Sequence, residues 1–278
     1  MYWESFVERF DLIQILFGLI IASVIAIISY RLRALSLSGV IGMITVGSII
    51  FGLGGMIFAV PLVFFFVSSS LLSFVKSYRK ELSKIAFDKT GPRDIYQVLA
   101  NGGVSTIAVL LYFITGNMFW FFPYLAGLCE AAADTWATEL GTLSKTDPVS
   151  ILTFKKVAPG QSGGVTLLGI LASLAGSFAV MGVGYGAVLF YGENILLSSI
   201  GLFFACANAG FVGALFDSVL GGSLQSQYKC AVCEKAIESK NHCGLPSEHI
   251  SGLCFMNNDM VNFLATFVAG IVIAIFVF

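Results

Sequence analysis

Long apolar runs separated by short polar stretches make up most of the chain. We predict eight membrane-spanning segments from these runs, at residues 12–30, 36–54, 57–75, 95–115, 118–136, 164–190, 195–219 and 259–278. A helix needs about 20 apolar residues to cross the hydrocarbon core, and the runs lack the alternation that is typical of barrel strands. The pattern therefore predicts an all-α, polytopic transmembrane helix bundle that forms a single domain over residues 1–278.

Basic residues fall almost entirely on one side of this predicted bundle. The connections after the first, third, fifth and seventh spans hold 14 of the 15 lysines and arginines, and Arg9 is the exception. By the positive-inside rule these connections face the cytoplasm, so we expect both termini outside. We predict a multi-pass protein of the cell membrane whose active face is cytoplasmic.

Composition supports a membrane class and excludes others. Hydrophobic residues make up 57% of the chain and charged residues 11%, whereas an ordinary soluble domain has about 25% charged residues. The net charge of −1 offers no basic surface, so we expect no nucleic-acid partner. The N-terminal residues include Glu4, Glu8 and Asp11, which are not typical of a signal peptide. Membrane lipids are the expected surroundings, and the sequence does not indicate an oligomeric state.

Acidic residues within or beside the predicted spans form the strongest chemical signal. Glu130, Asp134 and Thr138 recur every four residues, which places them on one face of a helix. Carboxylates this close repel one another unless a cation neutralises them, and magnesium prefers such oxygen ligands. We predict that magnesium neutralises Glu130, Asp134 and the adjacent Glu139, and that Asp217 and Asp259 add two carboxylates to the same cytoplasmic cavity. The alternative is that lysines or arginines of the bundle pair with them.

Two further polar stretches suit phosphate. Arg93, Gln97 and Asn101 again recur every four residues, and the glycine-rich turn at residues 159–164 offers backbone N–H groups at an expected helix N-terminus. We predict substrate or nucleotide binding by Lys89, Arg93, Gln97, Asn101, Thr138, Ser162, Gly163, Gly164 and Asn258. The structural alternatives are an interfacial anchor for Arg93, an interhelical hydrogen bond for Asn101 and a helix cap for the turn.

A cysteine-rich stretch lies within the predicted cytoplasmic loop at residues 221–256. Disulfides are rare in the cytoplasm, so the spacing favours a structural zinc site over a disulfide framework. The candidate ligands are Cys230, Cys233, His242 and Cys243. Since His249 and Cys254 follow, the choice of four ligands stays open, and free or redox-active thiols are the alternative. Thiolates do not suit magnesium, so this site is separate from the carboxylates.

These motifs, in this order, resemble those of an integral membrane family that includes transmembrane protein 19 and the plastid phytyl-phosphate kinase. The matching stretches are GPRDIYQVLANGG, ADTWATELG, PGQSGGVTLLG, FDSVLGGSLQ and NNDMVNFLAT. The resemblance implies a kinase that moves a phosphoryl group from a nucleoside triphosphate, CTP or ATP, to an isoprenyl monophosphate of the phytyl or geranylgeranyl type. It implies catalytic, magnesium-binding roles for Asp134, Glu139, Asp217 and Asp259, with Lys89, Arg93 and Ser162 around the phosphates.

Two other classes of protein use similar residues. Intramembrane carboxylates also suit an ion or small-solute transporter, but the polar motifs lie on one side and no internal repeat is evident. A CTP-dependent lipid cytidylyltransferase or a lipid-alcohol kinase needs the same metal and phosphate ligands, and the sequence does not separate these enzymes from an isoprenyl-phosphate kinase.

Overall fold

The computed structural model describes residues 11–75, 91–191 and 200–278, and most of these residues are helical. The helices are α2 (Leu12–Arg31), α3 (Leu37–Ser73), α5 (Ile95–Thr115), the short 3₁₀ helix η1 (Met118–Trp120), α6 (Phe121–Gly141), α7 (Leu167–Tyr191), α9 (Ile200–Ser223) and α10 (Asn258–Val277). Within these described ranges, six helices are long and apolar enough to cross a membrane: α2, α3, α5, α7, α9 and α10. The protein is therefore a polytopic helical membrane protein. The count of eight spans and the side of the termini stay predictions.

Side-chain caps fix where several helices begin. Asp11 accepts a hydrogen bond from the N–H of Ile13 at 2.9 Å, and Asn257 accepts one from Met260 at 3.0 Å. At the start of α5, Asp94 accepts from the Gln97 N–H at 3.0 Å, while the Gln97 side chain accepts from the Asp94 N–H at 3.1 Å. The first N–H groups of a helix have no partner within it, so these caps stabilise each entry into the bundle.

Helix α3 folds back on itself. Its 37 residues would span about 55 Å if straight, well beyond a hydrocarbon core of about 30 Å. Gly55 interrupts it with a φ of 69° and a ψ of −167°, a conformation that glycine adopts readily. Met43 and Phe66, on either side of Gly55, pack in one cluster with Ala26. A straight helix would separate these two residues by about 35 Å, so the second half of α3 returns toward its start.

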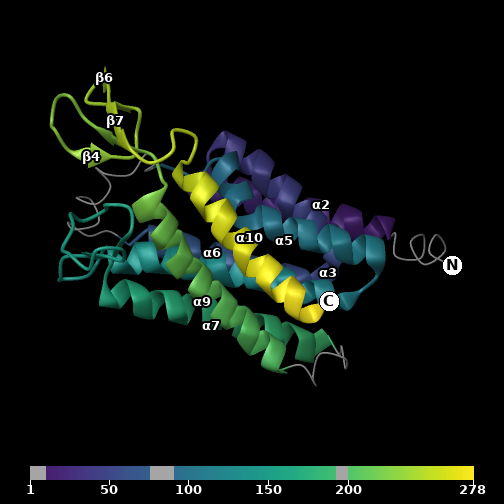
Figure 1. Cartoon of the computed structure of the whole chain (residues 1–278). Coiled ribbons are helices and arrows are strands. Elements are labelled where there is room, and N and C mark those ends of the chain that lie inside the picture. Colours follow the sequence, from purple (N-terminus) through teal and green to yellow (C-terminus); the bar gives the residue numbers. More distant parts are fainter. Residues whose placement is uncertain (1–10, 76–90, 192–199) are drawn as a thin grey trace.

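Helix α6 lies at the centre of the bundle and packs against α3, α5, α7, α9 and α10 (Figure 1). Its residues 121–133 are all buried. Phe121 and Tyr124 pack with Phe58 of α3, and the Tyr124 hydroxyl donates to the Phe58 carbonyl. Helix α9 comes close at Gly210, where an added Cβ would lie 2.6 Å from the Cβ of Cys129. These contacts hold α6 firmly along its first half.

Short strands gather at one end of the bundle. Strand β1 (Val149–Ser150) pairs with β2 (Gly164–Val165). The segment at 224–257, which we call the cysteine module, contains β3 (Gln227–Lys229), β4 (Ala236–Ile237), β5 (Asn241–His242), β6 (Leu245–Pro246) and β7 (Glu248–Ser251). Strand β3 lies between β4 and β7, and β5 pairs with β6, all antiparallel. The all-α prediction is thus incomplete, because strands this short carry no detectable sequence period.

The two ends of the bundle differ in what they carry. The cysteine module lies at one end, whereas the start of α2 and the end of α10 lie at the other (Figure 1). The chain leaves α9 and returns to α10 through backbone hydrogen bonds from Ser226 to Met256 at 2.8 Å and from Leu253 to Leu224 at 2.9 Å. These bonds attach the module directly to the ends of two helices.

Candidate functional site

A cavity of about 570 Å³ lies at the end of the bundle that carries the strands. This volume is within the usual range for small-molecule sites. Its walls come from the ends of α3, α6 and α9 and from the starts of α5, α7 and α10. It is lined by Arg93, Gln97, Asn101, Asp134, Thr138, Glu139, Ser162, Gly163, Gly164, Asp217, Asn258 and Asp259. These are all the predicted magnesium ligands and substrate residues that the structure describes; Lys89 lies outside the described residues.

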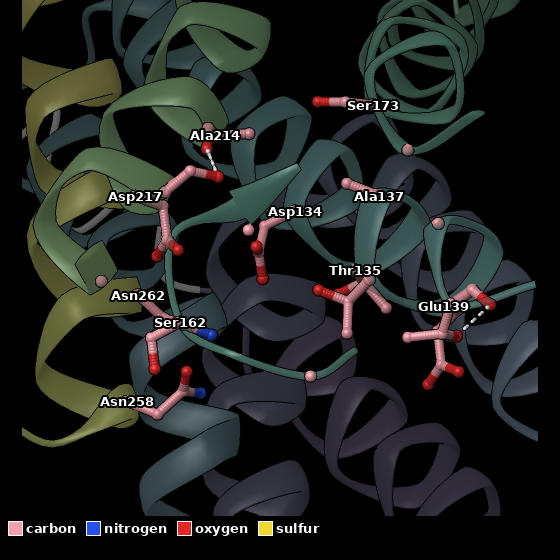
Figure 2. A pocket seen from close by; sticks show the side chains of 18 of the residues that line it. Asp134, Thr135, Ala137, Glu139, Ser162, Ser173, Ala214, Asp217, Asn258 and Asn262 are labelled. Carbon is pink, nitrogen blue, oxygen red and sulfur yellow. Dashed lines mark hydrogen bonds between the residues drawn. The ribbon is translucent and has the colours of Figure 1, made fainter. Parts of the chain in front are cut away.

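Asp134 of α6 and Asp217 of α9 face the same part of the cavity (Figure 2). Asn262 of α10, with its amide nitrogen turned toward Asp217, donates to Oδ2 at 3.2 Å. Within the described part of the chain, neither carboxylate is paired with a lysine or arginine. A carboxylate withdrawn from water needs an opposite charge, so these two acids suit a bound cation.

Glu139 lies apart from this pair, further along α6 (Figure 2). Its Oε1 accepts a hydrogen bond from the hydroxyl of Ser73, at the end of α3, at 2.6 Å. The four predicted magnesium ligands do not form a compact group. Within the described ranges, the cysteine module alone brings three or more histidine, cysteine, aspartate or glutamate ligand atoms together, and these lie within 4.8 Å of one another. Magnesium is usually held by one or two carboxylates with water and phosphate, and this open arrangement leaves room for both.

Arg93 supplies a cation to the cavity wall. Its backbone is fixed by hydrogen bonds to Ala34 and from Ser36, both at 3.0 Å, and its guanidinium lies 6.0 Å from the ring centroid of Phe66. Burial lowers the pKa of Arg93 from its ordinary value, and the negative charge of Glu139 opposes this shift. An arginine stays protonated in proteins, so Arg93 presents a charged fork that matches phosphate oxygens.

The glycine-rich turn at residues 159–164 lies against α9. Gly163 has a φ of 76°, and a Cβ there would lie 2.5 Å from the Cα of Gly222, so the close approach requires glycine. The Ser162 hydroxyl donates to Glu238 of the cysteine module at 2.7 Å. The expectation that this turn begins a helix was wrong. Gly164 belongs to β2, and α7 begins three residues later, where Thr166 accepts from the Gly169 N–H at 3.0 Å.

The polar stripe on α5 is partly used by the helix itself. Gln97 completes the capping box with Asp94, and the separation of three residues between them is the usual sequence signal for this cap. Asn101 donates to the Gln97 carbonyl at 2.9 Å, and its Oδ1 has no hydrogen-bond partner in the described residues. The same holds for the Ser173 hydroxyl and the Gln225 amide nitrogen, which also line the cavity. A buried polar atom without a partner costs about 1–3 kcal/mol, so a polar occupant would stabilise this wall.

Glu130 lies outside the cavity lining, one helical turn before Asp134. It is 1% exposed, and its Oε1 has no hydrogen-bond partner within the described ranges. A Cβ on Gly213 would lie 2.7 Å from the Glu130 Cγ, which places this side chain in the contact between α6 and α9. Glu130 therefore belongs to the layer that supports the cavity.

The cysteine module brings four ligand atoms together. The Nδ1 of His242 lies 3.5 Å from the sulfur of Cys233 and 3.2 Å from that of Cys243, and Cys230 completes a group within 4.8 Å. Cys254 lies outside this group, and His249 packs against the Tyr228 ring at 5.3 Å. The donor set suits zinc, whose presence stays a prediction. The Cys233 N–H donates to the Cys230 sulfur, and this contact is the main cause that lowers the pKa of Cys230 to about 6.

Sequence patterns missed several residues of the cavity wall. Ser73, Ser173 and Glu238 line it, yet none was predicted. Single serines in apolar helices are usually packing residues, so neither serine gave a signal. Glu238 stands 76 positions from Ser162, and their contact depends on how the module folds over the cavity. In the sequence, the one local signal for Glu238 was its charge and its position between the ligand pair Cys230 and Cys233 and the pair His242 and Cys243.

Comparison with known proteins identifies a family profile and several relatives that match this chain. The profile described as "Integral membrane protein DUF92" matches residues 20–270. Protein PGR of Arabidopsis thaliana is 32% identical over 275 residues, which cover 91% of this chain and 92% of PGR. Membrane protein MJ0933 of Methanocaldococcus jannaschii is 30% identical over 262 residues, 94% of this chain and 93% of that protein.

A more distant relative is the chloroplastic protein VTE6 of Arabidopsis thaliana. It is 24% identical over 203 residues, which cover 71% of this chain and 52% of VTE6. No solved structure matches the chain. These relatives fit the family that the sequence motifs resemble. The match over residues 20–270 shows that the chain belongs to the DUF92 family of integral membrane proteins.

Proposed function

We propose that this protein is a membrane kinase that transfers the γ-phosphoryl group of a nucleoside triphosphate to an isoprenyl monophosphate and releases the isoprenyl diphosphate. One observation carries the proposal. A single cavity holds two carboxylates, Asp134 and Asp217, that no lysine or arginine of the described residues pairs with, together with a charged arginine and a glycine-rich turn. Phosphoryl transfer depends mainly on positioning and on neutralising charge, and this set of residues suits both needs.

The reaction balances without a strong general base in the cavity. An oxygen of the acceptor monophosphate attacks the γ-phosphorus, the bond from that phosphorus to the β,γ-bridging oxygen breaks, and the nucleoside diphosphate leaves. The acceptor phosphate has a second pKa of about 6, so it is largely a dianion at neutral pH. Bound magnesium would neutralise charge on the transferring phosphoryl group. Asp134 and Asp217 would hold that ion, and Arg93 would orient phosphate oxygens.

The family supports the substrate class. The motifs resemble those of the family of the plastid phytyl-phosphate kinase, and VTE6 is among the relatives of this chain. CTP and ATP are the candidate donors. A cytidylyltransferase would instead direct the lipid phosphate at the α-phosphorus and release pyrophosphate, so the product identifies the reaction.

An apolar groove of about 520 Å³ suits the isoprenyl tail. It is lined by Phe51, Met56, Ala59, Val60, Val63, Phe64, Val67, Ser68, Leu71 and Val183. On α3 it runs from Met56 to Leu71, about 22 Å along the helix axis. Leu71 adjoins Ser70, which lines the polar cavity. We propose that a lipid whose phosphate lies in the cavity extends its tail along α3 within the membrane.

The topology suggests where the reaction takes place. If the chain crosses eight times with both termini outside, the cavity faces the cytoplasm of the cell. The fold-back of α3 at Gly55 and the central position of α6 suit that count. Nucleoside triphosphates are made in the cytoplasm, so the donor and the membrane-bound acceptor meet at this face.

The test is a product survey with purified protein. The full chain in detergent is incubated with magnesium, each of the four nucleoside triphosphates, and phytyl or geranylgeranyl phosphate, with the free alcohols alongside. Mass spectrometry should detect an isoprenyl diphosphate. Product from the alcohol alone would make the protein an alcohol kinase, and a nucleotidyl lipid would make it a cytidylyltransferase. The absence of any product from folded protein would favour transport.

A further inference from the structure

We infer that the cysteine module binds one zinc ion through Cys230, Cys233, His242 and Cys243, and that this ion fixes Glu238 in place to position the glycine-rich turn of the cavity. The inference does not depend on which reaction the cavity catalyses. It rests on the ligand group, on the small size of the module's own core, and on the hydrogen bond between Ser162 and Glu238.

The ligands come from two turns of the module. Cys230 and Cys233 lie between β3 and β4, and His242 and Cys243 lie where β5 turns into β6. A tetrahedral site with Zn–S bonds of about 2.3 Å and a Zn–N bond of about 2.0 Å places its ligand atoms about 3.5–3.8 Å apart. The separations of 3.2 and 3.5 Å from His242 Nδ1, within a group that spans 4.8 Å, need only small adjustments to reach that geometry.

The backbone around each ligand pair is unusual in a way that a metal explains. Glu234, just after Cys233, has a φ of 59°, and Cys243 has a φ of 51°. Both residues carry a side chain in the left-handed region, which persists only where surrounding contacts enforce it. The N–H groups of Val232 and Cys233 both point at the Cys230 sulfur, at 3.4 and 3.5 Å. Such N–H contacts stabilise a metal-bound thiolate.

The module has too little apolar core to hold this shape alone. Its buried cluster consists of Tyr228, Cys230 and Ile237. Chains this short usually need disulfides or a metal for a stable fold, and the four cysteines of the module are free. Zinc binding supplies folding free energy directly, so the ion would stabilise both turns together.

Glu238 connects this module to the cavity. Its neighbour Ile237 packs in the small core, and β4 pairs with β3 through Ile237 and Tyr228. Cys233 precedes Glu238 by five residues and His242 follows it by four, so zinc would restrain the chain on both sides. The 2.7 Å hydrogen bond from Ser162 to the Glu238 carboxylate has a charged acceptor, which strengthens it. Glu238 is thus a positioning residue for the turn that we assign to phosphate.

The first experiment measures metal in the full chain, purified without a histidine tag or chelator. Elemental analysis should find about one zinc ion per protein. Cys233→Ser should lose it, and the matched control Cys254→Ser should keep it, because Cys254 lies outside the ligand group. Wild-type protein without zinc, or equal loss in both variants, would overturn the metal assignment.

The second experiment measures backbone hydrogen exchange of residues 159–164 in the full-length protein without substrate. Glu238→Ala should keep zinc and exchange about tenfold faster in this turn, equivalent to about 1.4 kcal/mol. Glu238→Gln should restore protection, since its amide oxygen still accepts from Ser162. Glu248→Ala, on exposed β7, is the matched control and should behave like wild type.

These outcomes separate positioning from other roles. Unchanged exchange in Glu238→Ala would refute the positioning role even if Cys233→Ser fails to fold. Fast exchange in Glu238→Gln would mean that charge matters and that hydrogen bonding to Ser162 does not explain the effect. Neither the zinc content nor the hydrogen exchange requires turnover. A failed kinase assay would therefore neither support nor contradict this inference.

Discussion

The two halves of α6 have opposite characters within one helix. Residues 121–133 are entirely buried among aromatic and small side chains, whereas residues 134–141 are only partly covered and carry Asp134 and Glu139 toward the cavity. The apolar half is held by contacts with α3 and α9, and the polar half lines the cavity and contacts α7 and the end of α3. The difference indicates that the first half of α6 contributes mainly to the stability of the fold and the second half mainly to the chemistry of the cavity. Substitutions at one end should change unfolding, and those at the other should change turnover.

The largest effect is expected from Asp134 and Asp217, the two cavity carboxylates that we assign to magnesium. Asp134→Asn or Asp217→Asn keeps the side-chain shape but removes a charge that we assign to magnesium, so turnover should fall by roughly a hundredfold or more. Steady-state kinetics with purified variants checks this. The control Asp147→Asn removes an exposed acid whose contact with Lys156 spans 3.9 Å, and it should retain activity. Wild-type turnover in either cavity variant would contradict the assignment.

A smaller but clear effect is expected at Arg93. Arg93→Ala removes the charged fork while the backbone bonds to Ala34 and Ser36 remain. A hydrogen bond to a charged group contributes about 1.5–3 kcal/mol, so KM for a phosphate substrate should rise roughly 10–100-fold. Substrate titrations on Arg93→Ala and on the exposed control Lys155→Ala would measure it. Equal KM values in both variants would remove Arg93 from the site.

A substitution in the groove along α3 should reduce the use of acceptors with long tails more than the use of short ones. Val67→Trp places a bulky ring in the groove near its polar end, so use of geranylgeranyl phosphate should fall about tenfold, as loss of one or two kcal/mol of apolar contact implies. A short prenyl phosphate should be affected less. Ile27→Trp, on the exposed face of α2, is the matched control. If Val67→Trp and Ile27→Trp had the same activity as each other with both the long and the short acceptor, the groove would be excluded as the site of the tail.

The smallest effect is expected at the apolar end. Tyr124→Phe removes the hydroxyl that donates to the Phe58 carbonyl and leaves that buried oxygen without this donor. We expect a loss of about 1–2 kcal/mol in the free energy of unfolding, with unchanged kcat in the folded fraction. Thermal unfolding in detergent, beside the exposed control Tyr191→Phe, measures this. A fall in kcat without a change in stability would mean that the two ends of α6 are not separated.

Much of this organisation was predictable from the sequence, because hydropathy and charge report directly on the bilayer. The apolar runs and the order of the polar motifs indicated the helical membrane class and the family. Boundaries shifted where polar residues continue a helix. The predicted span at 118–136 became α6 at Phe121–Gly141, since Glu139 and its neighbours stay helical while they line the cavity. Between the predicted spans 36–54 and 57–75, Gly55 alone leaves the helical conformation.

The parts that sequence did not indicate depend on contacts between distant residues. Ser73 meets Glu139 across 66 positions and Ser162 meets Glu238 across 76, and no local period encodes such pairs. The Asp94 cap, which uses the Gln97 side chain, competed with the phosphate role inferred for Gln97. In the cysteine module, the spacing suggested the ligands, and only the fold separated Cys254 and His249 from the group of four.

Transfer of a labelled phosphoryl group tests the central claim most directly. The full-length protein in detergent is given magnesium, geranylgeranyl phosphate and a nucleoside triphosphate whose γ-phosphoryl oxygens are heavy isotopes, with Asp134→Asn as the negative control. Our account predicts that the heavy oxygens appear in the terminal phosphate of the lipid diphosphate, and only with the wild-type protein. Label that stays in released pyrophosphate, or equal lipid labelling by the Asp134→Asn variant, would contradict it.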